Sequence, residues 1–143
     1  MLIAHVIREK GSAVHTLSAE ATLAGAAHDL TERKVGALVI VDSAGAIAGL
    51  ISERDIVREL ARRGAGALSD TVASAMTREV ILARLDETVD EGLSRMTDRR
   101  IRHLPVVDGG KLVGIISIGD LVKHRIAAVE AEAAAMQAYI AAQ

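Results

Sequence analysis

Two stretches of the sequence read alike, KVGALVIVDSAGAIAGLISERDIVR at residues 34–58 and RIRHLPVVDGGKLVGIISIGDLVK at residues 100–123. Asp42 in the first stretch aligns with Asp108 in the second, and after one deleted residue Asp55 aligns with Asp120. The identical pairs include Leu38/Leu104, Val41/Val107, Gly45/Gly110, Gly49/Gly114, Ile51/Ile116 and Ser52/Ser117, and the register extends back to Arg33/Arg99, Thr22/Thr88 and Val14/Val80. Self-similarity of this length indicates an internal repeat, so one structural unit is expected twice.

Each copy has the same order of apolar and turn-forming segments, which predicts the order β-α-β-β-α twice. A short extended segment precedes a helix whose apolar residues recur at helical spacing, Leu23, Ala27 and Leu30 in the first copy and Val89, Leu93 and Met96 in the second. Ser18 and Asp86 are the expected N-caps of these helices. Two apolar strands follow, at 37–41 and 46–51 and at 104–107 and 112–116, joined by hairpins that contain Asp and Gly. A second helix begins at Ser52 or Ser117.

The expected fold class is α/β, or α+β, with the two repeats packed about a pseudo-twofold axis. A unit of about 60 residues buries too little surface to be stable alone, so we expect the two sheets to pack on each other. We place the first repeat at residues 1–63, a linker at 64–70, the second repeat at 71–126 and a C-terminal helix at 127–143. Pro105 is expected at the start or edge of its strand, where a missing N–H donor is tolerated.

The C-terminal segment carries a heptad pattern. Its apolar residues are spaced alternately by four and three positions, and they are Val122, Ile126, Val129, Ala133, Met136 and Ile140. The charged residues Lys123, Arg125, Glu130 and Glu132 flank this seam. A seam of this kind is typical of a helix that pairs with another helix, so we predict a homodimer. The alternative is that the helix lies back on its own domain.

The composition argues against several classes of function. A net charge of −2, with one Tyr, no Phe and no Trp, offers neither a basic surface nor stacking rings to nucleic acid. The absence of Cys excludes thiolate chemistry, and the five His residues include no close pair at metal-ligand spacing. No apolar run reaches the roughly 20 residues of a membrane span, and Arg8 comes too soon for a signal-peptide core. We therefore expect a cytoplasmic protein that is not an enzyme and binds neither nucleic acid nor membrane.

The motif Ser-x-x-Asp follows the second hairpin strand in both copies, as Ser52-Glu53-Arg54-Asp55 and as Ser117-Ile118-Gly119-Asp120. One interpretation is a capping box, in which the Ser and the acidic residue satisfy free amides at a helix start. The other adds a ligand, because this position lies beyond the carboxyl ends of the strands, where α/β units leave a crevice. A carboxylate there can accept hydrogen bonds from two adjacent hydroxyls, as in ribose, and the helix-start amides favour a phosphate.

A basic stretch, Arg99-Arg100-Ile101-Arg102-His103, precedes the first hairpin strand of the second copy. It is interpreted either as a helix end whose cations complement the helix dipole or as a source of phosphate contacts from Arg102 and His103. The first copy has Lys34-Val35-Gly36-Ala37 at this place. This asymmetry predicts one strong phosphate site and a weaker or different one, with Arg54 as a candidate cation for the first copy.

Taken together, HLPVVDGGKLVGIISIGDLV and GALVIVDSAGAIAGLISERDIV resemble the end segments of CBS domains, the repeats named after cystathionine β-synthase. Ala75-Met76-Thr77 followed by Val80 resembles the usual start of a second repeat. The resemblance covers about residues 6–125 and implies a tandem pair, or Bateman module, with no attached enzyme or channel. It also implies two clefts that accept AMP, ADP, ATP, related nucleotides or NAD(H).

The resemblance further implies roles for single residues. Asp55 and Asp120 would hold ribose hydroxyls with Ser52 and Ser117 beside them, Thr77 and the backbone around Leu82 would border the base or sugar, and Arg102 and His103 would face phosphate. The full set of candidate ligand-binding residues is Lys10, Gly36, Ser52, Arg54, Asp55, Thr77, Leu82, Ile101, Arg102, His103, Pro105, Ser117 and Asp120, with no metal ligand. The first copy departs from the family pattern, because Lys10-Gly11 stands where the second has Met76-Thr77.

These observations lead to two hypotheses. The first is a homodimeric sensor that binds an adenosine nucleotide and is read out by an unidentified protein target. The alternative is a ligand-free interaction scaffold that dimerises through its CBS faces and its C-terminal helix. A thermal-shift panel of AMP, ATP, NADH and S-adenosylmethionine distinguishes them, because only the sensor gains stability from a ligand.

Overall fold

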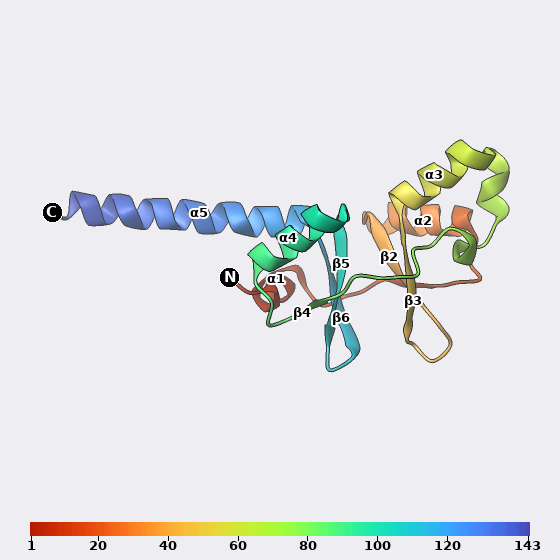
Figure 1. Cartoon of the computed structure of the whole chain (residues 1–143), viewed down its shortest axis with the longest axis horizontal. Coiled ribbons are helices and arrows are strands. Elements are labelled where there is room, and N and C mark those ends of the chain that lie inside the picture. The colour runs from red at the N-terminus through yellow and green to blue at the C-terminus, as the bar shows by residue number, and fades with distance from the viewer. The chain divides into compact units, whose positions relative to one another are not determined.

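The computed structural model describes residues 1–143 and contains two three-stranded sheets and five α-helices (Figure 1). In chain order the elements are α1 (Ile3–Lys10), β1 (Thr16–Ser18), α2 (Leu23–Arg33), β2 (Ala37–Val41), β3 (Ile47–Ser52), α3 (Glu53–Arg63), the 3-10 helices η1 (Ala65–Ser69) and η2 (Val72–Ser74), β4 (Ala83–Arg84), α4 (Val89–Arg99), β5 (His103–Asp108), β6 (Lys111–Ser117) and α5 (Ile118–Ala141). The predicted mixed α+β class and the doubled β-α-β-β-α order are confirmed.

The two sheets have the same topology. In one sheet β2 lies between a parallel neighbour, β1, and an antiparallel neighbour, β3. In the other sheet β5 lies in the same way between β4 and β6. Each hairpin also has a register shift at matching places, after Ile40 in β2 and after Val106 in β5. The sequence repeat is therefore a repeat of structure down to its irregularities.

The chain forms two compact units whose boundaries differ from those of the sequence repeats. Unit 1 combines Met1–Ala13 with Leu82–Gln143, and unit 2 is Val14–Ile81. In unit 1, the amide of Ile3 donates to the Glu87 carbonyl at 2.8 Å, and the side chain of Ile3 is fully buried. The helix α1, which the sequence reading did not expect, thus completes the unit that holds the second repeat.

A pair of matched glycines explains how a neighbouring segment of the chain fits against each sheet. A Cβ atom on Gly49 of β3 would lie 2.7 Å from Sδ of Met76 and 2.8 Å from the Thr77 carbonyl oxygen. A Cβ atom on Gly114 of β6 would lie 2.5 Å from Cδ1 of Ile7. Both glycines therefore allow an apolar side chain to lie directly on the strand, from a later segment at Gly49 and from an earlier one at Gly114.

The helices α2 and α4 begin later than expected. The N-caps are Thr22 and Thr88, whose hydroxyls accept from the amides of Gly25 and Glu91 at 3.0 Å, so the prediction of Ser18 and Asp86 was wrong. Ser18 is the last residue of β1 and its hydroxyl instead bonds the Glu20 carboxylate. The chain makes a turn between strand and helix, and the capping hydroxyl stands at the end of this turn.

Each unit has an aliphatic core, as the scarcity of aromatic residues requires. The unit 2 core includes the buried side chains of Leu23, Leu38, Ile40, Ile51 and Val72. Buried side chains of unit 1 include Ile3, Val6, Met96, Leu104, Ile116 and Leu121. No helix in the structure combines the length and the apolar character that crossing a bilayer needs.

The second helix of repeat two and the C-terminal tail are one continuous helix, α5 (Ile118–Ala141). It packs on α4 and α1 near its start, and Leu121 is fully buried there. Every residue after Ala128 is exposed, and Figure 1 shows the helix running on past α4. The tail therefore does not lie back on its own unit, so that alternative is excluded for unit 1.

Candidate functional site

Both Ser-x-x-Asp motifs form capping boxes at helix starts. At α3, the Asp55 carboxylate accepts from the Ser52 amide at 2.9 Å while the Ser52 hydroxyl accepts from the Asp55 amide. At α5, Asp120 accepts from the Ser117 amide at 2.8 Å, and the Ser117 hydroxyl accepts from the Asp120 amide at 3.1 Å. Capping therefore uses one carboxylate oxygen, Oδ2, in each motif. The other oxygen, Oδ1, has a different role in unit 1 and in unit 2.

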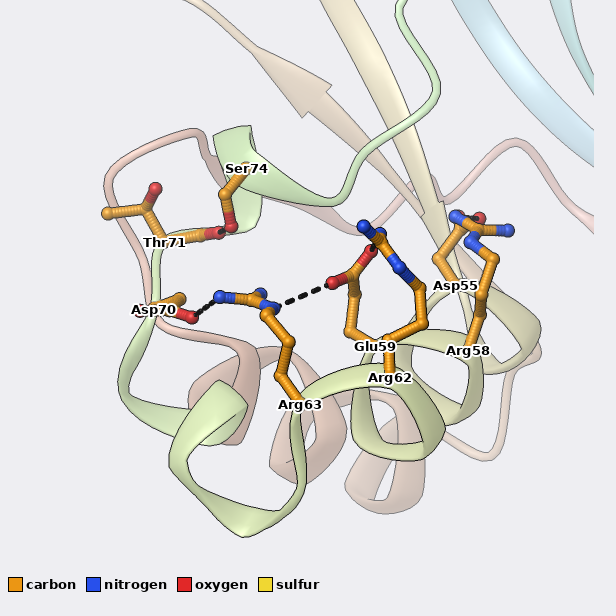
Figure 2. Close-up of polar contacts among 8 residues, drawn as sticks. All are labelled: Asp55, Arg58, Glu59, Arg62, Arg63, Asp70, Thr71 and Ser74. Carbon is orange, nitrogen blue, oxygen red and sulfur yellow. Dashed lines mark hydrogen bonds and ion pairs between the residues drawn. The ribbon is translucent and has the colours of Figure 1, made fainter.

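The carboxylate of Asp55 is closed off within unit 2. Its Oδ1 accepts from Nη2 of Arg58 at 2.8 Å, and only 8% of the side chain is exposed (Figure 2). Arg58 supplies the cation that pairs with Asp55, while Arg54, the candidate cation for a phosphate, lies exposed on α3. The spacing of three residues along a helix is the signal that could have identified Arg58.

The carboxylate of Asp120 is more open and has a different partner. Its Oδ2 also accepts from Nζ of Lys10 at 2.6 Å, 27% of its side chain is exposed, and its Oδ1 accepts no hydrogen bond from the chain. Nζ of Lys10 donates in addition to the Ile115 carbonyl at 2.8 Å. Lys10 lies near the start of repeat one in sequence, yet it contacts the motif of repeat two, because α1 belongs to unit 1.

Two basic side chains, Lys10 and His103, lie near Asp120 in unit 1, and Arg102 lies next to His103. His103 opens β5 opposite Ser117, and the Arg102 carbonyl accepts from the Ile118 amide at 2.8 Å. Burial, together with the charges of Arg102 and Lys10, lowers the pKa of His103. Burial raises the pKa of Asp120, but the hydrogen bonds from Lys10 and Ser117 and the charge of Lys10 outweigh it, so the pKa is lowered overall. The cluster is thus an ionised carboxylate among cationic or proton-accepting groups.

Unit 2 has no matching basic cluster at the equivalent place. The Gly36 carbonyl accepts from the Glu53 amide at 3.0 Å, as Arg102 does from Ile118, so Gly36 is the structural counterpart of Arg102. Ala37 lies opposite Ser52 and is the counterpart of His103. The asymmetry expected from the sequence is therefore present in the structure of the two units.

A groove with a volume of about 490 Å³ lies beside Gly36 between α2 and α3. Its lining includes Thr31, Lys34, Gly36, Glu53 and Val57 but neither Ser52 nor Asp55. Gly36 is therefore the only candidate residue of unit 2 that lines this groove.

The remaining candidate residues hold backbone positions. Thr77 pairs with Leu50 at the edge of β3 through two hydrogen bonds of 2.9 Å. In unit 1, the Leu82 carbonyl accepts from Arg95 at 2.7 Å, and the half-buried Ile101 donates its amide to the Met96 carbonyl at 3.0 Å. These contacts fix the chain around the motifs, and none of them shows a ligand.

Pro105 lies elsewhere than expected. It is buried inside β5, the central strand of its sheet, whereas the sequence placed it at a strand start or edge. The two-residue strand β4 pairs only with Val106 and Val107, so Pro105 lies beyond the end of β4. The missing donor is tolerated because the sheet is only two strands wide at this point.

Figure 2 shows a second polar cluster that the sequence reading did not identify, centred on the buried Glu59. Its two oxygens each bond an arginine at 3.0 Å, Oε1 with Arg62 and Oε2 with Arg63. Arg63 also pairs with Asp70 just after η1. The cluster ties the end of α3 to the segment that follows it and satisfies the buried carboxylate, which is a structural role.

The CBS-domain family model matches residues 7–62 and 72–127, which together make up most of the chain. The chain belongs to the CBS-domain family. Among curated relatives, this CBS pair is 33% identical to the CBS domain-containing protein CBSX3, mitochondrial, of Arabidopsis thaliana, over 96% of this chain and 71% of the relative.

Two solved structures of CBS-domain proteins are similar to this one. The CBS-domain protein ATU1752 from Agrobacterium tumefaciens has a TM-score of 0.85 and 39% identity, with 87% of this chain and 92% of that chain covered. The CBS domain pair of protein MJ0100, solved in complex with 5-methylthioadenosine and S-adenosyl-L-methionine, has a TM-score of 0.77 and 30% identity, with 86% and 94% covered.

Proposed function

We propose that this CBS pair is a regulatory module, not an enzyme, that binds an adenosine nucleotide such as AMP, ADP, ATP or NAD(H). The observation that carries the proposal is the Asp120 carboxylate, which keeps one oxygen unbonded in a cluster of basic residues. The complex of the similar MJ0100 pair with two adenosine compounds supports an adenosine-containing ligand for this chain too. We propose the cytoplasm as its location.

In unit 1, we assign the sugar to Asp120 and the phosphate to the basic residues. Oδ1 of Asp120 accepts from a ribose hydroxyl without breaking the capping bonds, which use Oδ2. Lys10, Arg102 and His103 then face the phosphate, with Ser117, Ile101, Pro105 and the backbone at Leu82 nearby in the same unit. Positive charge beside the sugar favours anionic nucleotides over S-adenosylmethionine, whose sulfonium is cationic.

In unit 2, the corresponding site is weaker under this proposal. Both oxygens of Asp55 are engaged, by Ser52 and by Arg58, so a ribose would have to displace an ion pair. Gly36 and Thr77 offer backbone groups but no charge, and Arg54, within the motif, is an exposed cation. We therefore assign the stronger nucleotide site to unit 1.

Thermal unfolding with a ligand panel tests the proposal. At a concentration of 100 times Kd, a nucleotide adds about 2.7 kcal/mol to the stability of the folded chain. Asp120→Asn retains an oxygen for the capping bond but loses the charge, so it should melt close to the parent and lose most of the shift. Asp108→Asn, an exposed aspartate of the β5–β6 hairpin, is the matched control and should keep the shift. The absence of a shift with every nucleotide would rule the proposal out.

The second candidate is an interaction scaffold that dimerises through its CBS faces and α5 and binds no ligand. The observation in its favour is that both aspartates serve as helix caps, a role that needs no ligand. Pull-down of protein partners by the full chain and by a chain lacking the α5 tail separates the two. A scaffold loses its partners with the tail whatever nucleotide is present, whereas partners of a sensor respond to nucleotide.

Homodimerisation through α5 is part of the proposal in both cases. Helix α5 carries large apolar side chains that remain exposed, including Ile126 at 52%, Met136 at 60% and Ile140 at 64%. Apolar side chains in one line on an exposed helix indicate a missing partner helix.

A further inference from the structure

The apolar seam of α5 faces away from the body of its own unit. In heptad terms, Ile126, Ala133 and Ile140 occupy the a positions, and Val122, Val129 and Met136 occupy the d positions. The residues that contact unit 1, Leu121, His124 and Ala128, fall at the c and f positions, on the opposite side of the helix. The seam is thus free to accept a second helix along its whole length, beside the unit as well as beyond it.

From this arrangement we propose that α5 pairs with α5 of a second copy as a parallel, in-register, two-stranded coiled coil. The inference rests on the dimer proposed above and adds the orientation and register of the two helices. It places both copies of unit 1 at the same end of the coiled coil.

The length of the exposed helix supports a partner of the same kind. The portion from Val129 to Ala141 has no contact that buries its apolar side chains within the chain. Isolated helices shorter than about 12–15 residues are marginal in water, so this portion gains stability from packing against another helix. A second copy offers a seam of identical length and spacing, because both helices carry the same sequence.

The charges beside the seam decide the orientation. In a parallel pair each g residue faces the e residue of the next heptad in the other helix, which places Arg125 opposite Glu130 of the second copy, twice by symmetry. In an antiparallel pair with the same seam overlap, Glu130 faces Glu130 of the second copy, and Glu132 faces Glu132 of the second copy. The parallel pair therefore has two attractive contacts where the antiparallel pair has two repulsive ones.

Arg125 is available for this contact. In the single chain its Nε lies 3.4 Å from Oδ1 of Asp90, and both side chains are about half exposed or more. An exposed ion pair of this length is weak, so the guanidinium can turn to Glu130 of the second copy or bridge both carboxylates.

Disulfide cross-linking tests the orientation cleanly, because the chain contains no Cys. In the parallel pair, Met136→Cys places two thiols side by side and the variant forms a symmetric disulfide dimer under mild oxidation. In the antiparallel pair, the two thiols lie about 15 Å apart, given a rise of about 1.5 Å per residue, and do not bond. Ala131→Cys, at an outward f position, is the matched control and should cross-link much more slowly.

Two results would overturn the parallel pairing, and neither depends on nucleotide binding. A mixture of Ile126→Cys and Met136→Cys chains that forms a mixed disulfide in preference to the symmetric ones means antiparallel pairing and overturns the proposal. A monomeric or trimeric mass by light scattering also overturns it. A nucleotide-induced thermal shift measured on the same samples reports on the nucleotide proposal separately, so either proposal can fail while the other stands.

Charge removal gives a second test with opposite signs for the two orientations. Glu130→Gln removes the attractive partner of Arg125 in the parallel pair and should raise the dimer Kd roughly two- to tenfold, more steeply at low salt. Glu132→Gln, which faces Gln137 of the second copy in that pair, should change the Kd little. If both variants dimerise more tightly, the parallel orientation is wrong.

Discussion

Lys10 and Asp120 show how a residue from the other sequence repeat can change the chemistry of a repeated motif. Burial raises the pKa of Asp120, yet the hydrogen bonds of Lys10 and the Ser117 amide and the charge of Lys10 leave the pKa below its ordinary value. Asp55, with the same motif, is neutralised by Arg58 from its own helix. Two copies of one motif therefore present different surfaces, one closed and one partly open.

The Lys10 contact predicts a specific dependence of stability on pH. A carboxyl with a lowered folded-state pKa stabilises the fold above its unfolded pKa of about 3.9, and this contribution disappears as the pH falls through the folded pKa. Lys10→Met should lower the free energy of unfolding at pH 7 by less than about 1 kcal/mol, because both side chains are partly exposed, and should make the loss of stability in acid smaller. Urea unfolding at pH 7 and in acid measures both effects. Lys111→Met is the control, and an acid loss as large in Lys10→Met as in the parent would contradict the prediction.

His103 offers a direct report of where a phosphate binds. Burial, followed by the charges of Arg102 and Lys10, lowers its pKa, so the ring is neutral at pH 7. A phosphate beside the ring stabilises the imidazolium, and saturating AMP should therefore raise the pKa of His103. NMR titration of the imidazole signals measures this change. His28, exposed on α2 of unit 2, is the internal control, and a pKa of His103 that AMP leaves unchanged would place the phosphate elsewhere.

At the scale of elements, the matched glycines of β3 and β6 should differ in their tolerance of a side chain. Gly49→Ala brings Cβ against the Thr77 backbone oxygen as well as Met76, whereas Gly114→Ala meets only the end of the flexible Ile7 side chain. We expect Gly49→Ala to lower the free energy of unfolding by about 1–3 kcal/mol and Gly114→Ala to lower it clearly less. Denaturant unfolding compares them with Gly66→Ala, where a Cβ meets nothing within 4 Å. If both substitutions lower the free energy of unfolding equally, the backbone at Thr77 yields to the new Cβ atom and the prediction is wrong.

The elements that the sequence predicted well are those with strong local signals. Two strands have apolar runs bounded by turn residues, at Ala37–Val41 and His103–Asp108. Two helix starts have a capping serine three residues before an aspartate, at Ser52 and Ser117. The N-caps of α2 and α4 were misplaced because several hydroxyl and acidic residues stand between strand and helix. The identical pair Thr22/Thr88 in the repeat alignment indicates the N-caps correctly.

The contacts that could not be predicted from the sequence are those between residues far apart in the chain. Helix α1 has a short apolar face of Ile3, Val6 and Ile7. The surface on which it packs comes from residues more than eighty positions later, such as Leu85 and Glu87, whose carbonyls accept from its first amides. The pairing of Lys10 with Asp120 depends on that packing. No local pattern around Lys10 indicates it, and only the alignment of Lys10-Gly11 with Met76-Thr77 marked the position as unusual.

At the scale of the whole molecule, ligand binding and self-association should be separable, because the residues that we assign to each do not overlap. A chain that ends after Ala128 retains every buried residue of α5 but loses four of the six seam residues, Val129, Ala133, Met136 and Ile140. We expect it to be monomeric by light scattering, to melt within a few degrees of the parent at high dilution, and to keep the nucleotide-induced shift. Ala133→Glu in the full-length chain is the matched variant, since it places a charge in the seam without shortening the helix. If either change abolishes the nucleotide shift while the chain remains folded by circular dichroism, the nucleotide site depends on the dimer, and the second copy contributes to it.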